Sequence, residues 1–180
     1  MRALLLVWLI GFAPVASAWQ LALGGGLVAG DLPMANQAAP TTGWSFMAQW
    51  SRQPFVARRW DVNLTVGQFA TDAVANGILE RGRIATAALL WERRIPFTYD
   101  LRPWLGAGLG ISHVRYDDRL QINAQGYAVD SYAPTSHTDA MAQVAMGLRL
   151  SRSWSVSLIG ATNWPAHFST ITLTLLWRLL

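Results

Sequence analysis

The chain has 180 residues, of which 52% are hydrophobic and only 13% are charged, with a formal net charge of +4 and no cysteine. The absence of cysteine excludes a disulfide scaffold and a cysteine-ligated metal site. The hydrophobic content excludes a disordered chain. The basic residues, all of them arginine, form no stripe along the sequence, so we expect no nucleic-acid partner.

Residues 1–18 have the features of a secretory signal peptide. Arg2 gives a positive start, residues 3–15 are apolar, and Ala16-Ser17-Ala18 is a small-x-small cleavage site. We therefore expect cleavage after Ala18, export, and a single domain over residues 19–180.

The rest of the chain alternates apolar and polar residues, which is the period of a β-strand. In residues 60–69, for example, Trp60, Val62 and Leu64 alternate with Asp61 and Asn63. Residues 101–114 are long for a strand of a soluble protein but suit a tilted strand that crosses a bilayer. The pattern predicts strands at residues 19–28, 44–51, 60–69, 83–93, 101–114, 138–150, 154–163 and 169–180.

The connections between these strands alternate in length. Turn-forming residues predict long loops at residues 29–43, 71–82 and 117–137, and the connections after the second, fourth and sixth strands are short. This arrangement is typical of an all-β, eight-stranded antiparallel transmembrane β-barrel of the outer-membrane, up-and-down type. The ten tryptophans favour the same fold, because indoles concentrate at membrane–water boundaries.

The alternative fold is a soluble lipocalin-like barrel, whose apolar face points inward. The low charge and the tryptophans at strand ends favour the membrane barrel instead. Side chains fill the lumen of an eight-stranded barrel, so we expect no pore. Asp61, Glu92, Arg102 and Arg149 fall on the inward parity, and we expect structural ion pairs among them.

The stretch LRPWLGAGLGIS in residues 101–112 resembles a strand of small outer-membrane barrels of the OmpA, OmpW and OmpX type. A closer resemblance is to the PagL family of lipid A 3-O-deacylases, also called acyloxyacyl hydrolases. It rests on the aromatic-rich strand at residues 44–51, the pair Trp60-Asp61, the Arg-Pro-aromatic start of residues 102–104, and residues 154–163. The family's catalytic signature is His-x-Ser-Asn late in the seventh strand, with an acidic residue in the eighth.

This signature is degenerate in the present chain. Aligning its asparagine with Asn163 places a glycine at the histidine position and Thr162 at the serine position, so Thr162 has no adjacent base. Sliding the motif forward gives His167 as the general base and Ser169 as the nucleophile, but no Asp or Glu follows Asp139.

We therefore expect an outer-membrane barrel with a structural or lipid- and surface-interaction role, PagL-like in fold but without the catalytic triad. The alternatives are a lipid A deacylase that uses His167 and Ser169, with Thr162 as another nucleophile, and an adhesin that acts through residues 117–137. The expected partners are outer-membrane lipids, lipopolysaccharide and the barrel-assembly machinery. We expect no cofactor, and no metal because the three histidines lack metal-ligand spacing.

Overall fold

The computed structural model describes residues 19–34, 37–52, 58–71, 78–96, 102–165 and 169–179. The predicted signal peptide lies outside them. Within these ranges no helix is long and apolar enough to cross a membrane. The strands are β1 (Trp19–Met34), β2 (Gln37–Arg52), β3 (Arg58–Thr71), β4 (Ile78–Arg94), β5 (Arg102–Ile122), β6 (Ala128–Tyr132), β7 (Thr135–Arg149), β8 (Trp154–Trp164) and β9 (Ser169–Arg178).

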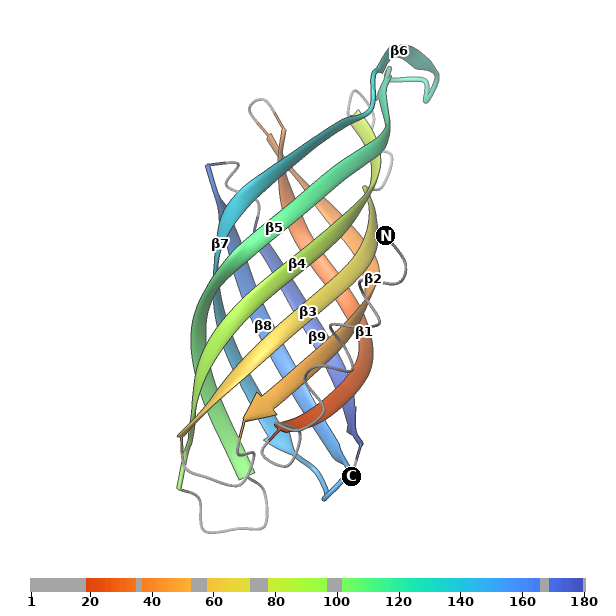
Figure 1. The fold of residues 1–180 in the computed structure, drawn as a ribbon. Helices are drawn as coiled ribbons and strands as arrows, with labels where there is room; N and C mark the ends of the chain where they lie inside the picture. Colours follow the sequence, from red (N-terminus) through yellow and green to blue (C-terminus); the bar gives the residue numbers. More distant parts are fainter. Residues whose placement is uncertain are drawn as a thin grey trace, which may run out of the picture.

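Eight of these strands close into one barrel (Figure 1). Their order is β4-β3-β2-β1-β9-β8-β7-β5, and an additional pairing between β4 and β5 closes the ring. Every pairing is antiparallel, and β6 pairs with β5 alone. The predicted fold class, an all-β eight-stranded antiparallel barrel, is confirmed. Below, the outer end of the barrel is the end that carries β6, and the inner end is the one where β1 begins and β9 ends.

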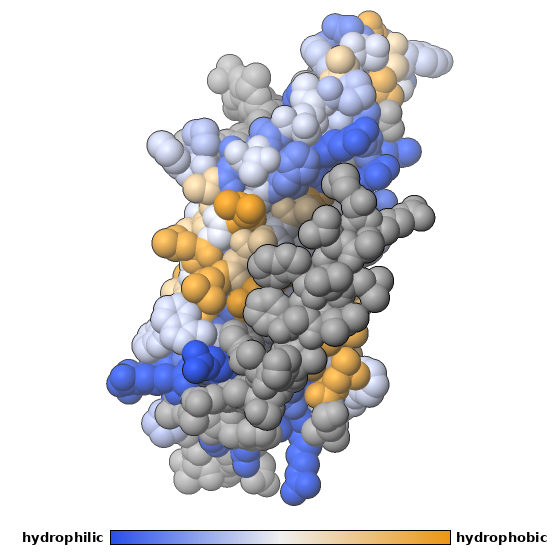
Figure 2. Space-filling view, viewed as in Figure 1, coloured by the Kyte–Doolittle hydropathy of each residue, from blue (hydrophilic) through white to orange (hydrophobic). Residues whose placement is uncertain are grey.

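The alternation along each strand decides which side chains face the lumen. In β9 every second residue is buried, from Thr170 to Arg178, whereas Leu173 and Leu175 between them are 50% and 46% exposed. On the face seen in Figure 2, exposed apolar side chains gather at the middle of the wall, with hydrophilic residues toward both ends. The lipocalin-like alternative is wrong, because its apolar face would point inward.

Tryptophans lie near both ends of the outer wall. At the inner end, Trp60 is the register partner of Trp91, and Trp154 is the partner of Trp177. Their side chains are between 39% and 49% exposed. Toward the outer end, Trp164 is 68% exposed. Aromatic side chains toward both ends of an apolar band are typical of a barrel that crosses a bilayer.

The predicted loop at residues 29–43 is wrong, because β1 and β2 form a hairpin that continues to the pair Met34–Gln37. Pro33 and Pro40 suggested a loop, since proline cannot donate a ladder hydrogen bond. However, β1 pairs with β9 only as far as Asp31, and β2 pairs with β3 only from Thr41. The prolines therefore lie in a two-stranded part of the hairpin, where the second edge of each strand is open and a missing N–H is tolerated.

The predicted loop at residues 117–137 is also mostly strand. It contains the end of β5, all of β6 and the start of β7. All five side chains of β6 are exposed, so this hairpin has no apolar-polar alternation from which strands could have been predicted. In the predicted loop at residues 71–82, β3 ends at Thr71 and β4 begins at Ile78. Residues 72–77 lie outside the described ranges.

Candidate functional site

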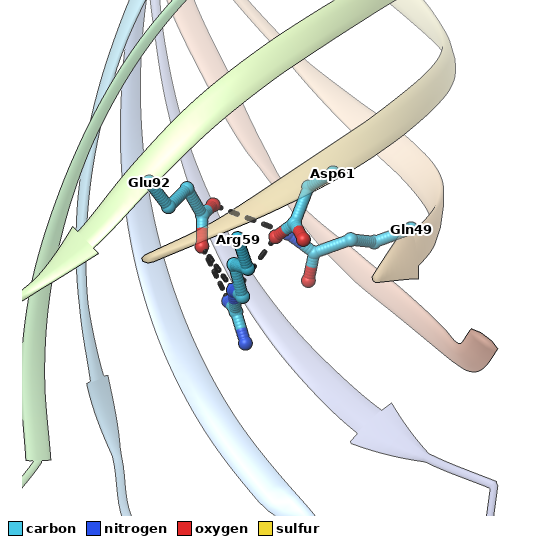
Figure 3. Close-up of polar contacts among 4 residues, drawn as sticks. All are labelled: Gln49, Arg59, Asp61 and Glu92. Atoms are coloured by element: carbon cyan, nitrogen blue, oxygen red, sulfur yellow. Dashed lines mark hydrogen bonds and ion pairs between the residues drawn. The ribbon is translucent and has the colours of Figure 1, made fainter. Parts of the chain in front are cut away.

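A polar cluster fills the lumen toward the inner end (Figure 3). We call Gln49, Arg59, Asp61 and Glu92 the lumen network; they come from β2, β3 and β4. The Arg59 guanidinium lies 3.1 Å from the Asp61 carboxylate and 2.5 Å from the Glu92 carboxylate. Gln49 Nε2 donates to Asp61 Oδ2 at 2.8 Å, and Arg59 Nε donates to Glu92 Oε2 at 2.6 Å.

The lumen network is almost fully excluded from solvent, with Asp61 and Glu92 at 0% and 1% exposure. The Arg59 guanidinium also lies 5.5 Å from the centre of the Trp104 ring, which closes the network from the β5 side. Buried charges must be paired, and here one guanidinium bridges two carboxylates on adjacent strands. The arrangement stabilises the β3–β4 register, in which Arg59 and Glu92 are directly opposite each other.

The inward positions of Asp61 and Glu92 were predicted correctly, but their predicted arginine partners were wrong. Arg102 is exposed at the start of β5. Arg149 donates to the carbonyl oxygens of Ser151 and Arg152 at 3.0 and 3.1 Å. Arg59 was not predicted to face the lumen, because it falls in the connection expected before residue 60. It is two residues from Asp61, so the alternation of a strand extended by two residues places both side chains on the same face.

A second group of polar side chains lies in the lumen toward the outer end. Asn163 Nδ2 donates to Ser112 Oγ at 3.0 Å, and His137 Nε2 lies 3.2 Å from Asp139 Oδ2. Between these groups and the lumen network, the described lumen contains a cavity of about 20 Å³ lined mainly by small and β-branched residues. Such a cavity is scarcely larger than one water molecule. Buried side chains thus occupy the described lumen at both levels, which is typical of a barrel of eight strands.

The predicted nucleophiles lie on the outer wall and not in the lumen. Thr162 and Ser169 are exposed register partners in β8 and β9, and Ser169 Oγ donates to Thr162 Oγ1 at 3.3 Å. The predicted base, His167, lies outside the described residues. The structure therefore brings the two hydroxyls together at the outer end and leaves their pairing with His167 a prediction.

The other two histidines each have a protein partner. His113 is exposed near the outer end, and its Nδ1 lies 2.8 Å from Thr138 Oγ1. His137, predicted in a loop, belongs to β7 and packs beside Tyr116 at 5.7 Å. In the described part of the chain, no three histidine, aspartate or glutamate side chains are grouped to hold a metal ion.

The hairpin formed by the end of β5 and β6 extends beyond the barrel (Figure 1). We call residues 119–132 the projecting hairpin. Its tip is ordered, because Asn123 Oδ1 accepts hydrogen bonds from the N–H groups of Gln125 and Tyr127 at 3.0 and 2.9 Å. Tyr127 and Val129 are 71% and 59% exposed. The hairpin thus presents apolar and aromatic side chains to solvent on a defined backbone.

Side-chain contacts also connect the two strands at the base of the projecting hairpin. The Arg119 guanidinium lies 5.2 Å from the Tyr116 ring and 5.8 Å from the Tyr132 ring. Tyr132 Oη donates to Gln121 Oε1 at 3.3 Å across the two strands. These contacts hold the two strands together where they leave the barrel, so the tip has a fixed support.

Comparisons with known proteins identify the fold. The structure is similar to that of Ail, the attachment invasion locus protein of Yersinia pestis, solved in complex with the heparin analogue sucrose octasulfate. The TM-score is 0.58 and the identity 12%, covering 90% of this chain and 99% of Ail. It is also similar to Neisserial surface protein A, with a TM-score of 0.57 and 10% identity over 88% of this chain and 96% of that one. No family model and no curated protein matches the sequence.

Proposed function

We propose that this chain is an outer-membrane barrel that serves as a surface-interaction protein and makes its contacts through the projecting hairpin. The observation that carries this proposal is the hairpin itself, whose tip is held by hydrogen bonds to Asn123 and exposes Tyr127 and Val129. Exposed aromatic and apolar side chains on a rigid support are typical of binding surfaces. The fold shared with an attachment protein and a surface protein supports the same role.

Placement in the membrane rests on the outer wall. The apolar band and the tryptophans at both of its ends fit a barrel solvated by lipid. Long connections of outer-membrane barrels face the outside, so the projecting hairpin faces the cell's surroundings and the inner end faces the periplasm.

The test compares bacteria that express the chain with bacteria that express the double variant Tyr127→Ser/Val129→Ser. Attachment is measured to cultured epithelial cells, immobilised heparin and purified extracellular-matrix protein. We expect the wild type to attach to at least one of these surfaces and the double variant to lose that attachment. Gln125→Ala, on the same hairpin, is the matched control and should attach normally. If the wild type confers no attachment, or the double variant keeps it, the proposal is wrong.

Lipid A deacylation is our second proposal, favoured by the contact between the Thr162 and Ser169 hydroxyls at the outer end of the wall. In the proposed orientation this place borders the leaflet that contains lipid A. A hydroxyl there needs a base, and His167 lies between the two hydroxyls in sequence. Mass spectrometry of lipid A, with and without the protein, tests this activity. Loss of one acyl chain that His167→Ala abolishes would establish it, and unchanged lipid A beside correctly inserted protein would exclude it.

A further inference from the structure

Two arginines lie directly opposite each other on the outer wall at the inner end. Arg58 of β3 is the register partner of Arg93 of β4, and both side chains are exposed. Directly opposite residues on one face have Cβ atoms about 4.5–5.5 Å apart, and like charges in this arrangement repel. Two residues further along the same face is the exposed pair Trp60 and Trp91. The arginine pair therefore lies just outside an aromatic girdle, at the depth of lipid headgroups.

No protein carboxylate neutralises this pair within the described ranges. The described acidic side chains of the inner end are Asp61 and Glu92. Both are buried in the lumen, where they form ion pairs with Arg59. The other described ion pairs, such as Arg83–Asp117, lie toward the outer end. The pair thus has the charge and the spacing to receive one phosphate between two guanidinium groups.

A groove in the outer wall begins beside this arginine pair. Arg93 is the register partner of Leu105, and Leu105 lines the groove. The groove has a volume of about 350 Å³, and its lining is almost wholly apolar. It crosses β5, β7, β8 and β9 along a row of register partners, and its outward-facing lining residues include Ile95, Pro103, Leu105, Met146, Leu158 and Leu173.

The direction of the groove fits a lipid chain. The strands are tilted, so a row of register partners that starts at β4 rises obliquely through β5 and β7 (Figure 1). A lipid whose phosphate lies at the arginine pair would therefore direct a chain from the headgroup level toward the middle of the apolar band. The shape of the groove is formed in part by Gly147, which leaves room for the edge of the Trp104 ring.

We propose that the arginine pair Arg58–Arg93 and the groove beside it form a binding site for one anionic phospholipid of the periplasmic leaflet. The phosphate binds between the two guanidinium groups, and one acyl chain occupies the groove. The site depends on the membrane placement proposed above but not on the role of the projecting hairpin.

The experiment uses the full-length barrel extracted in mild detergent, with its folded state verified by heat-modifiable gel mobility. Native mass spectrometry then measures the binding of dioleoyl phosphatidylglycerol and dioleoyl phosphatidylcholine. We expect phosphatidylglycerol to be preferred, and Arg58→Gln/Arg93→Gln to weaken its binding about twenty-five-fold, because each arginine beside an anionic lipid contributes about fivefold. Arg152→Gln, in the turn between β7 and β8 at the same end, is the control and should change binding little.

Two further measurements separate the groove from the phosphate site. Leu158→Trp fills the groove, so it should weaken the binding of dioleoyl phosphatidylglycerol. The binding of dihexanoyl phosphatidylglycerol, whose chains are short, should stay unchanged. Equal binding of both lipid headgroups, or full binding by Arg58→Gln/Arg93→Gln, would overturn the proposal. So would a preference for lipopolysaccharide or for inorganic phosphate alone. Failure of the barrel to reach the outer membrane of cells would instead contradict the proposed function.

Discussion

Arg59 is the residue on which the charge balance of the inner lumen depends. Replacing it with methionine leaves Asp61 and Glu92 buried without their cation, and removing one partner of a buried ion pair costs about 3–5 kcal/mol. We expect Arg59→Met to lower the free energy of unfolding by this amount, measured by urea unfolding in liposomes. Adding Asp61→Asn and Glu92→Gln should restore most of the loss, because no buried charge then remains. An unchanged unfolding midpoint in the single variant would show that the network does not stabilise the barrel.

Gly147 is required by a close approach and not by its backbone conformation. A Cβ atom at this position would lie 2.4 Å from Cζ2 of Trp104, whose ring is 7% exposed. Gly147→Ala must displace the ring, and we expect a destabilisation of about 1–3 kcal/mol together with a changed tryptophan fluorescence spectrum. Gly160→Ala is the matched control, since its Cβ would meet Val144 Cγ2 at 3.4 Å, and it should unfold within about 0.5 kcal/mol of wild type. A normal spectrum for Gly147→Ala would contradict this packing.

At the scale of the strands, the segments that lie in the bilayer could be predicted from the sequence, whereas the segments that extend beyond the bilayer could not. The residues from Trp60 to Val66 alternate because one face meets lipid and the other the lumen, so their orientation was predictable. The outer parts of β1, β2 and β5 do not have to present one apolar face to lipid. Their prolines and polar residues are typical of loops, so these strand segments were not predicted. The contact of Thr162 with Ser169 depends on the β8–β9 register, which no local pattern determines.

The projecting hairpin should be able to open locally while the barrel stays folded. Asn123 Oδ1 accepts two backbone hydrogen bonds at the tip, and Gly126 has a φ of 84° that other residues rarely adopt. We expect Asn123→Ala to speed amide hydrogen exchange in residues 119–132 at least about fivefold, because each lost hydrogen bond costs about 1 kcal/mol. Unfolding of the barrel should stay unchanged. Gln125→Ala, whose backbone N–H still donates to Asn123, is the control, and equal exchange in both variants would exclude a role for the Asn123 side chain.

At the scale of the whole molecule, the two ends of the barrel differ in chemistry. The described part of the inner end exposes Arg58, Arg93 and Arg102, and the described acids of that end are buried in the lumen. At the outer end, Asp117 lies 3.0 Å from each of Arg83 and Arg115. Exposed arginines at one end suit a leaflet of anionic phospholipid, and a hairpin that projects from the other end suits the cell surface. Both proposals therefore require the same orientation in the membrane.

This orientation can be measured directly, because the chain contains no cysteine to interfere with labelling. Val129 in the projecting hairpin is 59% exposed, and Arg152 is exposed in the turn between β7 and β8. We expect Val129→Cys to react with a membrane-impermeant maleimide on intact cells, and Arg152→Cys to react only after the outer membrane is permeabilised. Both variants must show heat-modifiable mobility, so that misfolded protein does not account for the labelling. The reverse pattern would place the hairpin in the periplasm and the arginine pair in the lipopolysaccharide leaflet, and would thereby contradict both the surface role and the phospholipid site.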